Sequence, residues 1–499
     1  MENDKLYFTT EIEKTAVETL EKATSNCLSL CVLTDTHFFQ DGTWDDTVDN
    51  ISAVLKKTKA ESIIHLGDFT DGNFSKLVTS NYVNQMMKDL KRNGVPVYVT
   101  PGNHDANFLK GNPEPFSREE QVALFEMEAP YYFRDFDRQK IRCLFLYSYD
   151  IKTPVRYGFS KEELEWVENI LEETPDGYKV IIFSHEAPLP WLDFWSHLIR
   201  NGDRMMEILE SYNQKENRHI LAYIYGHTHS DLIYMDSSFP IISIGCNKCE
   251  QISVHQIPKG AVSYSRERNS VTQDLWDIVL VNPVEEKLEF IRFGAGENRT
   301  IDCHKRVSTW REKREEKRKN RKPKIWAHRG SSSFAPENTM PAFAVAKDLY
   351  VDGITVDVRM TLDKELVTVR DEQFKKIVDV SGQVEDYTFE ELEQFNVAKE
   401  KPAFGRLTIP TLKEALSLFR DTDYSIYIML EQEEGNTVKE IKDKVMELAK
   451  YLNMEQQVVF SVSRFQIHYA DDEEDALSAK GQGADIIITK RPGVLVAVL

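Results

Sequence analysis

The sequence lacks three features that would place the chain in a membrane or outside the cell. It has no apolar run near the roughly 18 residues that cross a bilayer, and its N-terminus lacks the basic-then-apolar order of a signal peptide. Its six cysteines are too few in 499 residues for a disulfide framework. We therefore expect a cytoplasmic protein with no transmembrane segment.

Only one pair of cysteines has a spacing of interest, because Cys246 and Cys249 form a Cys-x-x-Cys sequence. A zinc or redox site of this kind normally needs a second pair or neighbouring histidines. We interpret both residues as ordinary thiols.

Positive charge is also in short supply, with 62 Lys and Arg against 82 Asp and Glu and a net charge of −20. This balance disfavours binding to nucleic acid or to an acidic membrane. An anionic substrate would need bound metal ions to reverse the field locally. The exception is the basic segment 305–323, which we interpret as a charged linker that forms a solvated helix, with anionic lipid or RNA binding as the alternative.

A chain of this length exceeds one ordinary core and predicts two or three domains. Residues 28–304 alternate apolar strand-like runs with helical stretches, which predicts an α/β domain. It is preceded by a helical extension over 1–27 and closed by a hairpin of Trp276–Val281 and Leu288–Phe293. Residues 324–499 repeat the alternation and predict a second α/β domain, barrel-like in architecture.

Polar residues that bind metals follow five apolar runs of the first domain, each at the point where the predicted strand ends. In α/β sheets the functional crevice lies outside the carboxyl ends of strands, so these side chains are expected to converge. They are Asp35 and His37 after Leu28–Leu33, Asp68 after Ser62–Leu66, Asn103 and His104 after Val95–Val99, His185 after Val180–Phe183, and His227 and His229 after Ile220–Tyr225.

The spacing within these segments suits a metal centre. Asp-x-His and His-x-His place two side chains on one side of an extended segment, and the glycines before Asp68, Asn103 and His227 allow a close backbone approach. Imidazole, carboxylate and amide ligands favour Mn, Fe, Zn or Co.

The five segments, in this order, resemble the calcineurin-like metallophosphoesterase superfamily over about residues 28–300, with no ligand position missing. The resemblance implies a two-sheet sandwich flanked by helices and two divalent or trivalent metal ions. It also implies a metal-bridging hydroxide that attacks phosphorus in line. Asp35, His37 and His229 would bind one ion, Asn103, His185 and His227 the other, and Asp68 would bridge. His104 would contact the phosphate and the leaving oxygen, and Asp105 would orient His104.

The second domain resembles a glycerophosphodiester phosphodiesterase, a TIM-type barrel, over about 324–495. The motifs are His328-Arg329-Gly330, Pro336-Glu337-Asn338-Thr339 and Gly483-Ala484-Asp485 with the strand that follows. The resemblance implies a metal held by carboxylates and two catalytic histidines.

This second domain departs from its family's pattern at the catalytic positions. Thr355 replaces an acidic metal ligand, Arg370 replaces the second histidine, and Met429 replaces a later glutamate. Thr and Met offer no anionic oxygen to a hard cation, and Arg does not shuttle protons. The chain also drops at least one βα unit near Ser463–Tyr469. We expect a shortened, inactive barrel in which His328, Arg329 and Arg370 either bind phosphate or remain as locally hydrogen-bonded remnants.

We therefore predict a metal-dependent phosphohydrolase acting on a small phosphate ester, with phosphodiesters favoured by analogy with the second domain. A phosphomonoesterase or nucleotide diphosphatase would use the same ligands, and a non-catalytic scaffold or phosphate-binding protein is the alternative from another class. The oligomeric state stays open. The insertions 106–135 and 186–218 are expected to line the substrate entrance, with Trp191, Phe194 and Trp195 as candidate contacts.

Overall fold

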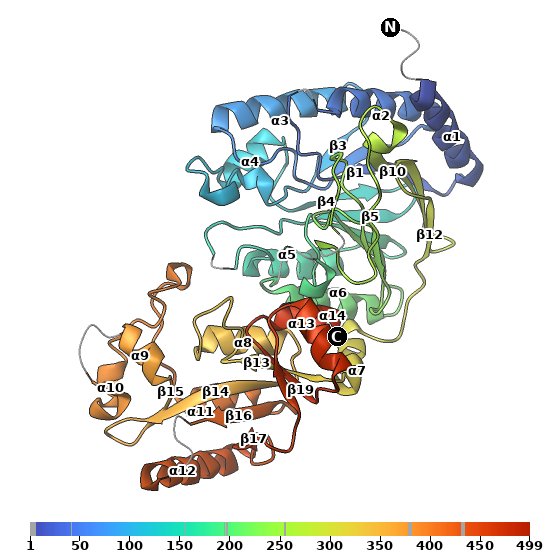
Figure 1. Cartoon of the computed structure of the whole chain (residues 1–499). Helices are drawn as coiled ribbons and strands as arrows, with labels where there is room; N and C mark the ends of the chain where they lie inside the picture. The colour runs from blue at the N-terminus through green and yellow to red at the C-terminus, as the bar shows by residue number, and fades with distance from the viewer. Residues whose placement is uncertain are drawn as a thin grey trace. The chain divides into compact units, whose positions relative to one another are not determined.

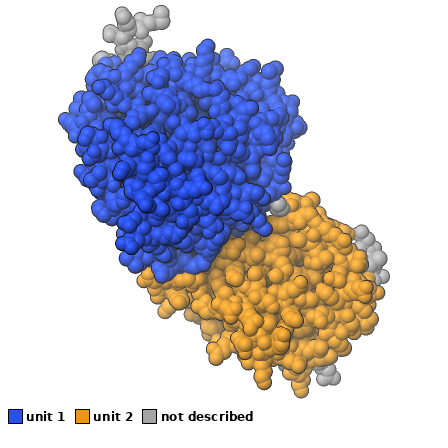
Figure 2. All heavy atoms as spheres, turned by 180° about the vertical axis from the view of Figure 1, so that it is seen from behind, with its two compact units in different colours: residues 1–313 blue, residues 314–499 orange. Residues whose placement is uncertain are grey.

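The computed structural model describes residues 6–40, 42–153, 155–193, 195, 198–253, 256–377, 382–430 and 435–499. The chain divides into two compact units, residues 1–313 and 314–499 (Figures 1 and 2). The division falls inside the segment that the sequence predicted as a linker. None of the helices in the described ranges combines the length and the apolar character needed to cross a bilayer.

Two six-stranded sheets form the centre of unit 1. The first has the order β12-β11-β10-β1-β2-β3 and comprises β1 (Leu28–Leu33), β2 (Ser62–His65), β3 (Val97–Val99), β10 (Leu275–Asn282), β11 (Lys287–Gly294) and β12 (Arg299–Asp302). The second has the order β4-β5-β6-β7-β9-β8 and comprises β4 (Tyr132–Phe136), β5 (Ile141–Phe145), β6 (Lys179–Phe183), β7 (His219–Tyr225), β8 (Leu232–Tyr234) and β9 (Ile241–Ser243).

The inner faces of these sheets pack on each other. Leu30 and Val32 of β1 meet Ile181 and Phe183 of β6 in one fully buried cluster. Every residue of β7 is buried, which explains why this strand reads as a continuous apolar run rather than an alternating one. The predicted two-sheet sandwich is therefore confirmed.

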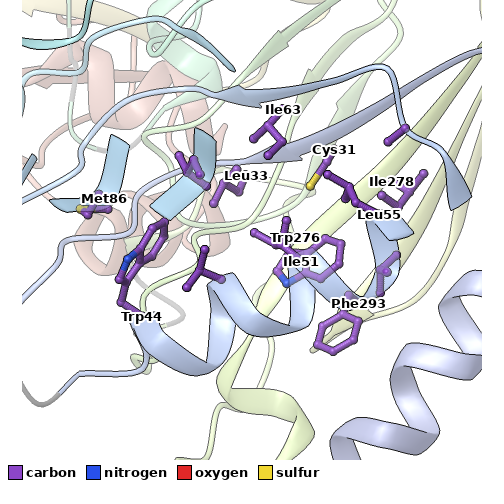
Figure 3. Close-up of a cluster of buried hydrophobic side chains, with 14 of the residues drawn as sticks. Cys31, Leu33, Trp44, Ile51, Leu55, Ile63, Met86, Trp276, Ile278 and Phe293 are labelled. Atoms are coloured by element: carbon purple, nitrogen blue, oxygen red, sulfur yellow. The ribbon is translucent and has the colours of Figure 1, made fainter. Parts of the chain in front are cut away.

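Helices cover the outer faces of the sandwich (Figure 1). On the first sheet lie α1 (Leu6–Lys22), α2 (Trp44–Thr58) and α3 (Lys76–Lys91), whereas α5 (Lys161–Glu172) and α6 (Gly202–Gln214) lie on the side of the second sheet. Figure 3 shows the apolar cluster beneath α2, where helix and strand side chains interlock: Trp44, Ile51, Leu55, Met86, Cys31, Leu33, Ile63, Trp276, Ile278 and Phe293. The short helix α4 (Arg118–Leu124) and the 3₁₀ turns at His104–Ala106, Leu109–Gly111, Pro190–Leu192 and Val271–Gln273 complete this unit.

Unit 2 is built on a parallel sheet of order β17-β16-β14-β13-β19-β18, with β15 paired antiparallel to β14. The strands are β13 (Lys324–His328), β14 (Gly353–Met360), β15 (Leu366–Thr368), β16 (Ser425–Met429), β17 (Val458–Val459), β18 (Ile467–Tyr469) and β19 (Ile486–Thr489). The helices are α8 (Met340–Asp348), α9 (Asp371–Ile377), α10 (Phe389–Leu392), α11 (Leu412–Phe419), α12 (Asn436–Leu452), α13 (Glu473–Gly481) and α14 (Pro492–Val498).

The sheet of unit 2 does not close on itself within the described residues, because its end strands β17 and β18 do not pair. The chain runs from β17 to β18 through residues 460–466, which contain no helix. A complete TIM barrel has eight parallel strands joined by helices. This direct passage agrees with the sequence prediction that a βα unit is missing near this point. Unit 2 is therefore a shortened, open relative of the TIM barrel.

The basic segment forms the helix α7 (Trp310–Asn320), but the expectation that it is solvated is wrong for three of its arginines, Arg314, Arg318 and Arg321. Arg318 and Arg321 are buried, and they pair with Asp423 and Asp352 of the same unit. Guanidinium groups used in this way belong to the folded unit and are not displayed for lipid or RNA.

Candidate metal centre

The structure brings together the seven side chains that the sequence predicted as ligands. Asp35, His37, Asp68 and His229 each offer an atom within 4.8 Å of the others. Asp68 also belongs to a second group of the same compactness with His185 and His227. Two adjacent clusters therefore share one carboxylate.

Asn103 joins the second cluster, because its Oδ1 lies 3.2 Å from Nε2 of His185. An amide oxygen beside an imidazole nitrogen completes a mixed ligand set of the type that first-row transition metals accept.

The backbone reason for this convergence differs from the one that the sequence suggested. We expected Asp-x-His and His-x-His to project both side chains from an extended segment. The chain instead enters the left-handed region at Asp35 (φ 51°), His37 (φ 45°), His227 (φ 61°) and His229 (φ 53°), and also at Asp68 (φ 58°). Non-glycine residues rarely adopt this conformation, and such strain concentrates at functional sites.

Two buried carboxylate oxygens lie at the centre of the clusters. Asp35 Oδ1 lies 3.2 Å from Nε2 of His229, and Asp68 Oδ2 lies 3.3 Å from Nε2 of His185. Among the described residues, neither oxygen has a partner with hydrogen-bond geometry. A buried carboxylate oxygen without a partner is costly unless a cation meets it. The donor set therefore fits metal ions.

Electrostatics in the cluster favours the ionised form of the shared carboxylate. Burial alone raises the pKa of Asp68, but His185 and His104 outweigh it and hold that pKa well below its usual value. An anionic Asp68 is the form that binds cations.

The second ring nitrogen of three ligand histidines lies beside an oxygen outside the ligand set. Nδ1 of His37 lies 3.0 Å from Asp71 Oδ1, an ion-pair distance without hydrogen-bond geometry, and Nδ1 of His229 contacts the Glu250 carboxylate. Nδ1 of His185 contacts the Leu66 carbonyl oxygen at 2.6 Å. These contacts direct the Nε2 lone pairs of all three rings toward the cluster, as outer partners of metal-binding histidines do.

The sequence did not reveal Asp71, Glu250 or Asp193 as partners of the ligand histidines. The Oδ2 atom of Asp193 lies 3.2 Å from Nε2 of His227. Glu250 follows β9, the parallel neighbour of β7, so the rule that strand ends converge could have found it. Asp193 lies in an insertion, and no local pattern marks it.

His104 lies beside the shared carboxylate, with Nε2 3.8 Å from Asp68 Oδ2. Its orientation comes from Asp71, whose carbonyl oxygen lies 2.7 Å from His104 Nδ1. The role predicted for Asp105 is not what the contacts show. Its carboxylate accepts the backbone N–H groups of Asp68, Phe69 and Gly102 at 2.8–2.9 Å. Asp105 thus fixes the loops that carry Asp68 and Asn103.

Close backbone approach explains two of the motif glycines. A Cβ on Gly102 would lie 2.2 Å from Asp68 Oδ1 and 2.7 Å from Nε2 of His185. A Cβ on Gly226 would lie 2.1 Å from Oγ1 of Thr34. Any side chain at these positions would displace the neighbouring side chains.

The aromatic contacts predicted for the substrate entrance are only partly located. Trp191 packs against Trp310, with ring centroids 5.8 Å apart. Trp195 is 40% exposed, and Phe194 lies outside the described residues. Trp191 is therefore a packing residue.

Residues 28–231 match the family model of calcineurin-like phosphoesterases, and residues 328–476 match that of the glycerophosphoryl diester phosphodiesterase family. The chain contains one domain of each family. Both resemblances drawn from the sequence motifs are confirmed. We call these regions the phosphoesterase domain and the diesterase-family domain.

Individual relatives resemble parts of the chain. A glycerophosphodiester phosphodiesterase of Caldanaerobacter subterraneus subsp. tengcongensis is 36% identical over 139 residues, which are 28% of this chain and 56% of that protein. An uncharacterized protein of Bacillus subtilis is 34% identical over 142 residues, which are 28% of this chain and 57% of that protein. The chain spans about half the length of these curated relatives.

Among solved structures, a dimetal phosphatase from Danio rerio covers 55% of this chain and 99% of its own, with a TM-score of 0.42 and 17% identity. A glycerophosphodiester phosphodiesterase from Agrobacterium tumefaciens covers 35% of this chain and 99% of its own, with a TM-score of 0.31 and 19% identity.

In the diesterase-family domain, arginine side chains pair with the acidic side chains that remain in the family's motifs. Arg329 Nε lies 2.6 Å from Asp357 Oδ2, and its Nη1 lies 3.2 Å from Glu337. Arg370 Nε donates to the other Glu337 oxygen at 2.8 Å and also pairs with Glu372. The carboxylates are thus neutralised by protein cations.

A second substituted position of this domain, Thr355, agrees with that arrangement. Thr355 Oγ1 accepts the backbone N–H of Arg329 at 2.9 Å and lies 3.2 Å from Nδ1 of His328. Burial, with Arg329 nearby, lowers the pKa of His328 to about 4. His328 is therefore neutral at physiological pH.

Proposed function

We propose that the phosphoesterase domain is a metal-dependent phosphohydrolase that acts on small phosphodiesters. The observation that carries the proposal is the pair of buried, unpartnered oxygens, Asp35 Oδ1 and Asp68 Oδ2, surrounded by imidazole nitrogens. The family match supports phosphate-ester hydrolysis as the reaction class.

We assign the ligands to two ions from the two clusters. Asp35, His37 and His229 would hold the first, Asn103, His185 and His227 would hold the second, and Asp68 belongs to both clusters. Mn, Fe, Zn and Co all suit these donors.

Bound metals of this kind neutralise phosphate charge and lower the pKa of water. The protein's own contribution is geometric. Burial of the ligand carboxylates strengthens their hold on cations, because the local dielectric is low. The left-handed backbone at Asp35 and His227 aims their side chains before any ligand arrives, so little reorganisation is needed.

His104 is the residue proposed to meet the substrate. It is partly exposed, with 19% of its side-chain surface accessible, whereas the ligand His185 is fully buried. Its Nδ1 is bonded to the Asp71 carbonyl, so Nε2 faces the site. In this position it can hydrogen-bond a phosphate oxygen and give a proton to the leaving oxygen.

The same ligands serve a phosphomonoesterase or a nucleotide diphosphatase. We favour diesters because the diesterase-family domain accompanies the site in one chain, which is an association rather than a contact. A panel of bis-p-nitrophenyl phosphate, p-nitrophenyl phosphate and a nucleotide diphosphate, run on the full chain with Mn²⁺, separates the three.

We propose that the diesterase-family domain does not hydrolyse its own substrate. Arg329 and Arg370 act there as internal counter-ions for Glu337 and Asp357. A phosphate binding to His328, Arg329 and Arg370 would have to displace these carboxylates, so the contacts favour locally paired remnants over a phosphate site.

The experiment that tests the proposed function is a turnover assay of the full chain and of its Asp68→Ala variant. Mn²⁺-dependent release of p-nitrophenol from the diester, lost in the variant, supports the proposal. A variant that retains more than a tenth of the wild-type rate contradicts it.

A further inference from the structure

A sixth segment, residues 244–250 after β9, contributes to the metal centre. Its backbone is bonded to the first ligand segment, because Asn247 N–H donates to the Thr34 carbonyl at 2.9 Å and Lys248 N–H donates to the Asp35 carbonyl at 3.0 Å. Lys248 and Glu250 are thereby held beside the side chains that follow β1. Cys246 and Cys249 lie in this segment, but the sequence did not reveal Lys248 or Glu250.

Lys248 contacts two carboxylates. Its Nζ lies 3.5 Å from Asp71 Oδ1 and 3.3 Å from Glu250 Oε2. The same two carboxylates face the outer nitrogens of two ligands, with Asp71 on Nδ1 of His37 and Glu250 on Nδ1 of His229. A chain of contacts therefore links His37 to Asp71, Asp71 to Lys248, Lys248 to Glu250, and Glu250 to His229.

The two histidines joined in this way belong to the same cluster. Their Nε2 atoms lie 3.3 Å apart. In the other cluster, His185 relies on a backbone carbonyl and His227 on Asp193. The arrangement is therefore asymmetric.

We infer that Lys248, Asp71 and Glu250 form a bridge that positions His37 and His229 for the first metal ion. The inference rests on the proposed dinuclear site. Asp71 and Glu250 are 31% and 24% exposed, so each carboxylate has room to turn toward solvent. Lys248 keeps both in place by offsetting their mutual repulsion, and each in turn fixes the tautomer and direction of its imidazole.

Two possible roles of Lys248, as a nearby cation or as a residue that positions the carboxylates, predict opposite changes in metal affinity when its side chain is removed. If the side chain acted only as a nearby cation, its removal would tighten the binding of a metal ion. If it holds the two carboxylates, its removal loosens the histidines and weakens binding. The sign of the change in affinity thus separates the two roles.

The test is calorimetric titration of the metal-free full chain with Mn²⁺. We expect two ions per wild-type chain. Glu250→Ala and Asp71→Ala should each weaken one of the two sites about 10–100-fold, the usual effect of losing an outer partner, and leave the other within about twofold. Glu250→Gln keeps an oxygen that accepts the Nδ1 hydrogen, so it should restore most of the affinity. Lys248→Met should weaken the same site at least threefold.

Matched controls are Lys56→Met and Glu165→Ala, which change exposed residues of the same types. Thermal unfolding of the metal-free variants reports general loss of structure, and Glu250→Gln supplies a second variant if an alanine variant unfolds. Equal weakening of both sites, no weakening, or tighter binding in Lys248→Met would overturn the inference. A wild-type chain that binds fewer than two ions would instead overturn the proposed function.

Discussion

Nε2 of His37 lies 3.3 Å from Nε2 of His229. The Nδ1 atoms face the carboxylates of Asp71 and Glu250, and in neutral rings a hydrogen on each Nδ1 leaves a lone pair on both Nε2 atoms. Two lone pairs directed at one small region repel each other unless a cation lies there. This relationship, together with Asp35 Oδ1, defines the first proposed ion position from the protein's own atoms.

Metal removal should destabilise the phosphoesterase domain. A ligand that binds only the folded state at one hundred times its Kd adds about 2.7 kcal/mol of stability. We expect Mn²⁺ to raise the unfolding temperature of the chelated protein, as measured by calorimetry. The Asp35→Asn variant should lose most of this response, and an equal response in that variant would count against the assignment.

Replacing His104 should separate turnover from metal binding. Loss of a positioned acid typically costs about 10²–10⁴ in rate. His104→Ala should therefore lower kcat by this factor and still bind two metal ions, as measured by elemental analysis. His304→Ala, at a histidine with 67% of its side chain exposed, is the control and should retain full activity.

Gly102→Ala should impair the second ion position, because the added Cβ would lie 2.2 Å from Asp68 Oδ1 and 2.7 Å from Nε2 of His185. We expect a reduced metal content and at least a tenfold loss of turnover. Gly481→Ala is the matched control, since a Cβ there meets no atom within 4 Å. Similar activity in both variants would refute the crowding argument.

A buried carboxyl outside the ligand set predicts a pH effect on stability. Burial raises the pKa of Glu163 from its ordinary 4.5 to about 8. The folded state therefore keeps a proton that the unfolded state releases, so stability falls as the pH rises from 4.5 to 8. The slope is at most about 1.4 kcal/mol per pH unit.

Glu163→Gln should remove this contribution to the slope, because the amide does not titrate. Its oxygen can still accept the N–H of Tyr147, as Oε1 does now at 2.8 Å. The measurement is denaturant unfolding between pH 5 and pH 8. Glu165→Gln, at an exposed position of the same helix, should leave the slope unchanged. A Glu163→Gln variant that loses stability with pH as steeply as wild type would disprove this account.

The diesterase-family domain should add nothing to turnover. His328→Ala and Asp357→Asn should keep the wild-type kcat on bis-p-nitrophenyl phosphate, since Asp357 is occupied by Arg329. Stability is a separate readout, because Asp357→Asn removes one anionic partner of a half-buried guanidinium. A large fall in kcat for either variant would show that the barrel takes part in catalysis.

Much of the phosphoesterase domain follows from sequence patterns. Leu28–Leu33 was predicted with its observed bounds, because a short apolar run ended by polar residues is a strong strand signal. The seven ligand positions follow the carboxyl ends of parallel strands in both sheets, β1, β2 and β3 in one and β6 and β7 in the other. The sandwich and the missing βα unit were also anticipated.

Other features depend on tertiary contacts that no local pattern encodes. The left-handed backbone at Asp35 and His37 is imposed by hydrogen bonds to the segment after β2, such as that from Asp35 N–H to the Gly67 carbonyl at 3.0 Å. The carboxylate of Asp105 was assigned to His104 because they are adjacent in sequence, whereas it faces backbone amides. The burial of Arg318 could not be predicted, because a helix made almost entirely of charged residues gives no pattern that shows which of its faces packs against the domain.

The most direct measurement is anomalous diffraction from crystals of the full chain grown with Mn²⁺. The account predicts two manganese peaks, one among Asp35, His37, Asp68 and His229, and one among Asp68, Asn103, His185 and His227. An absence of peaks at these positions, with manganese bound elsewhere or not at all, would contradict it.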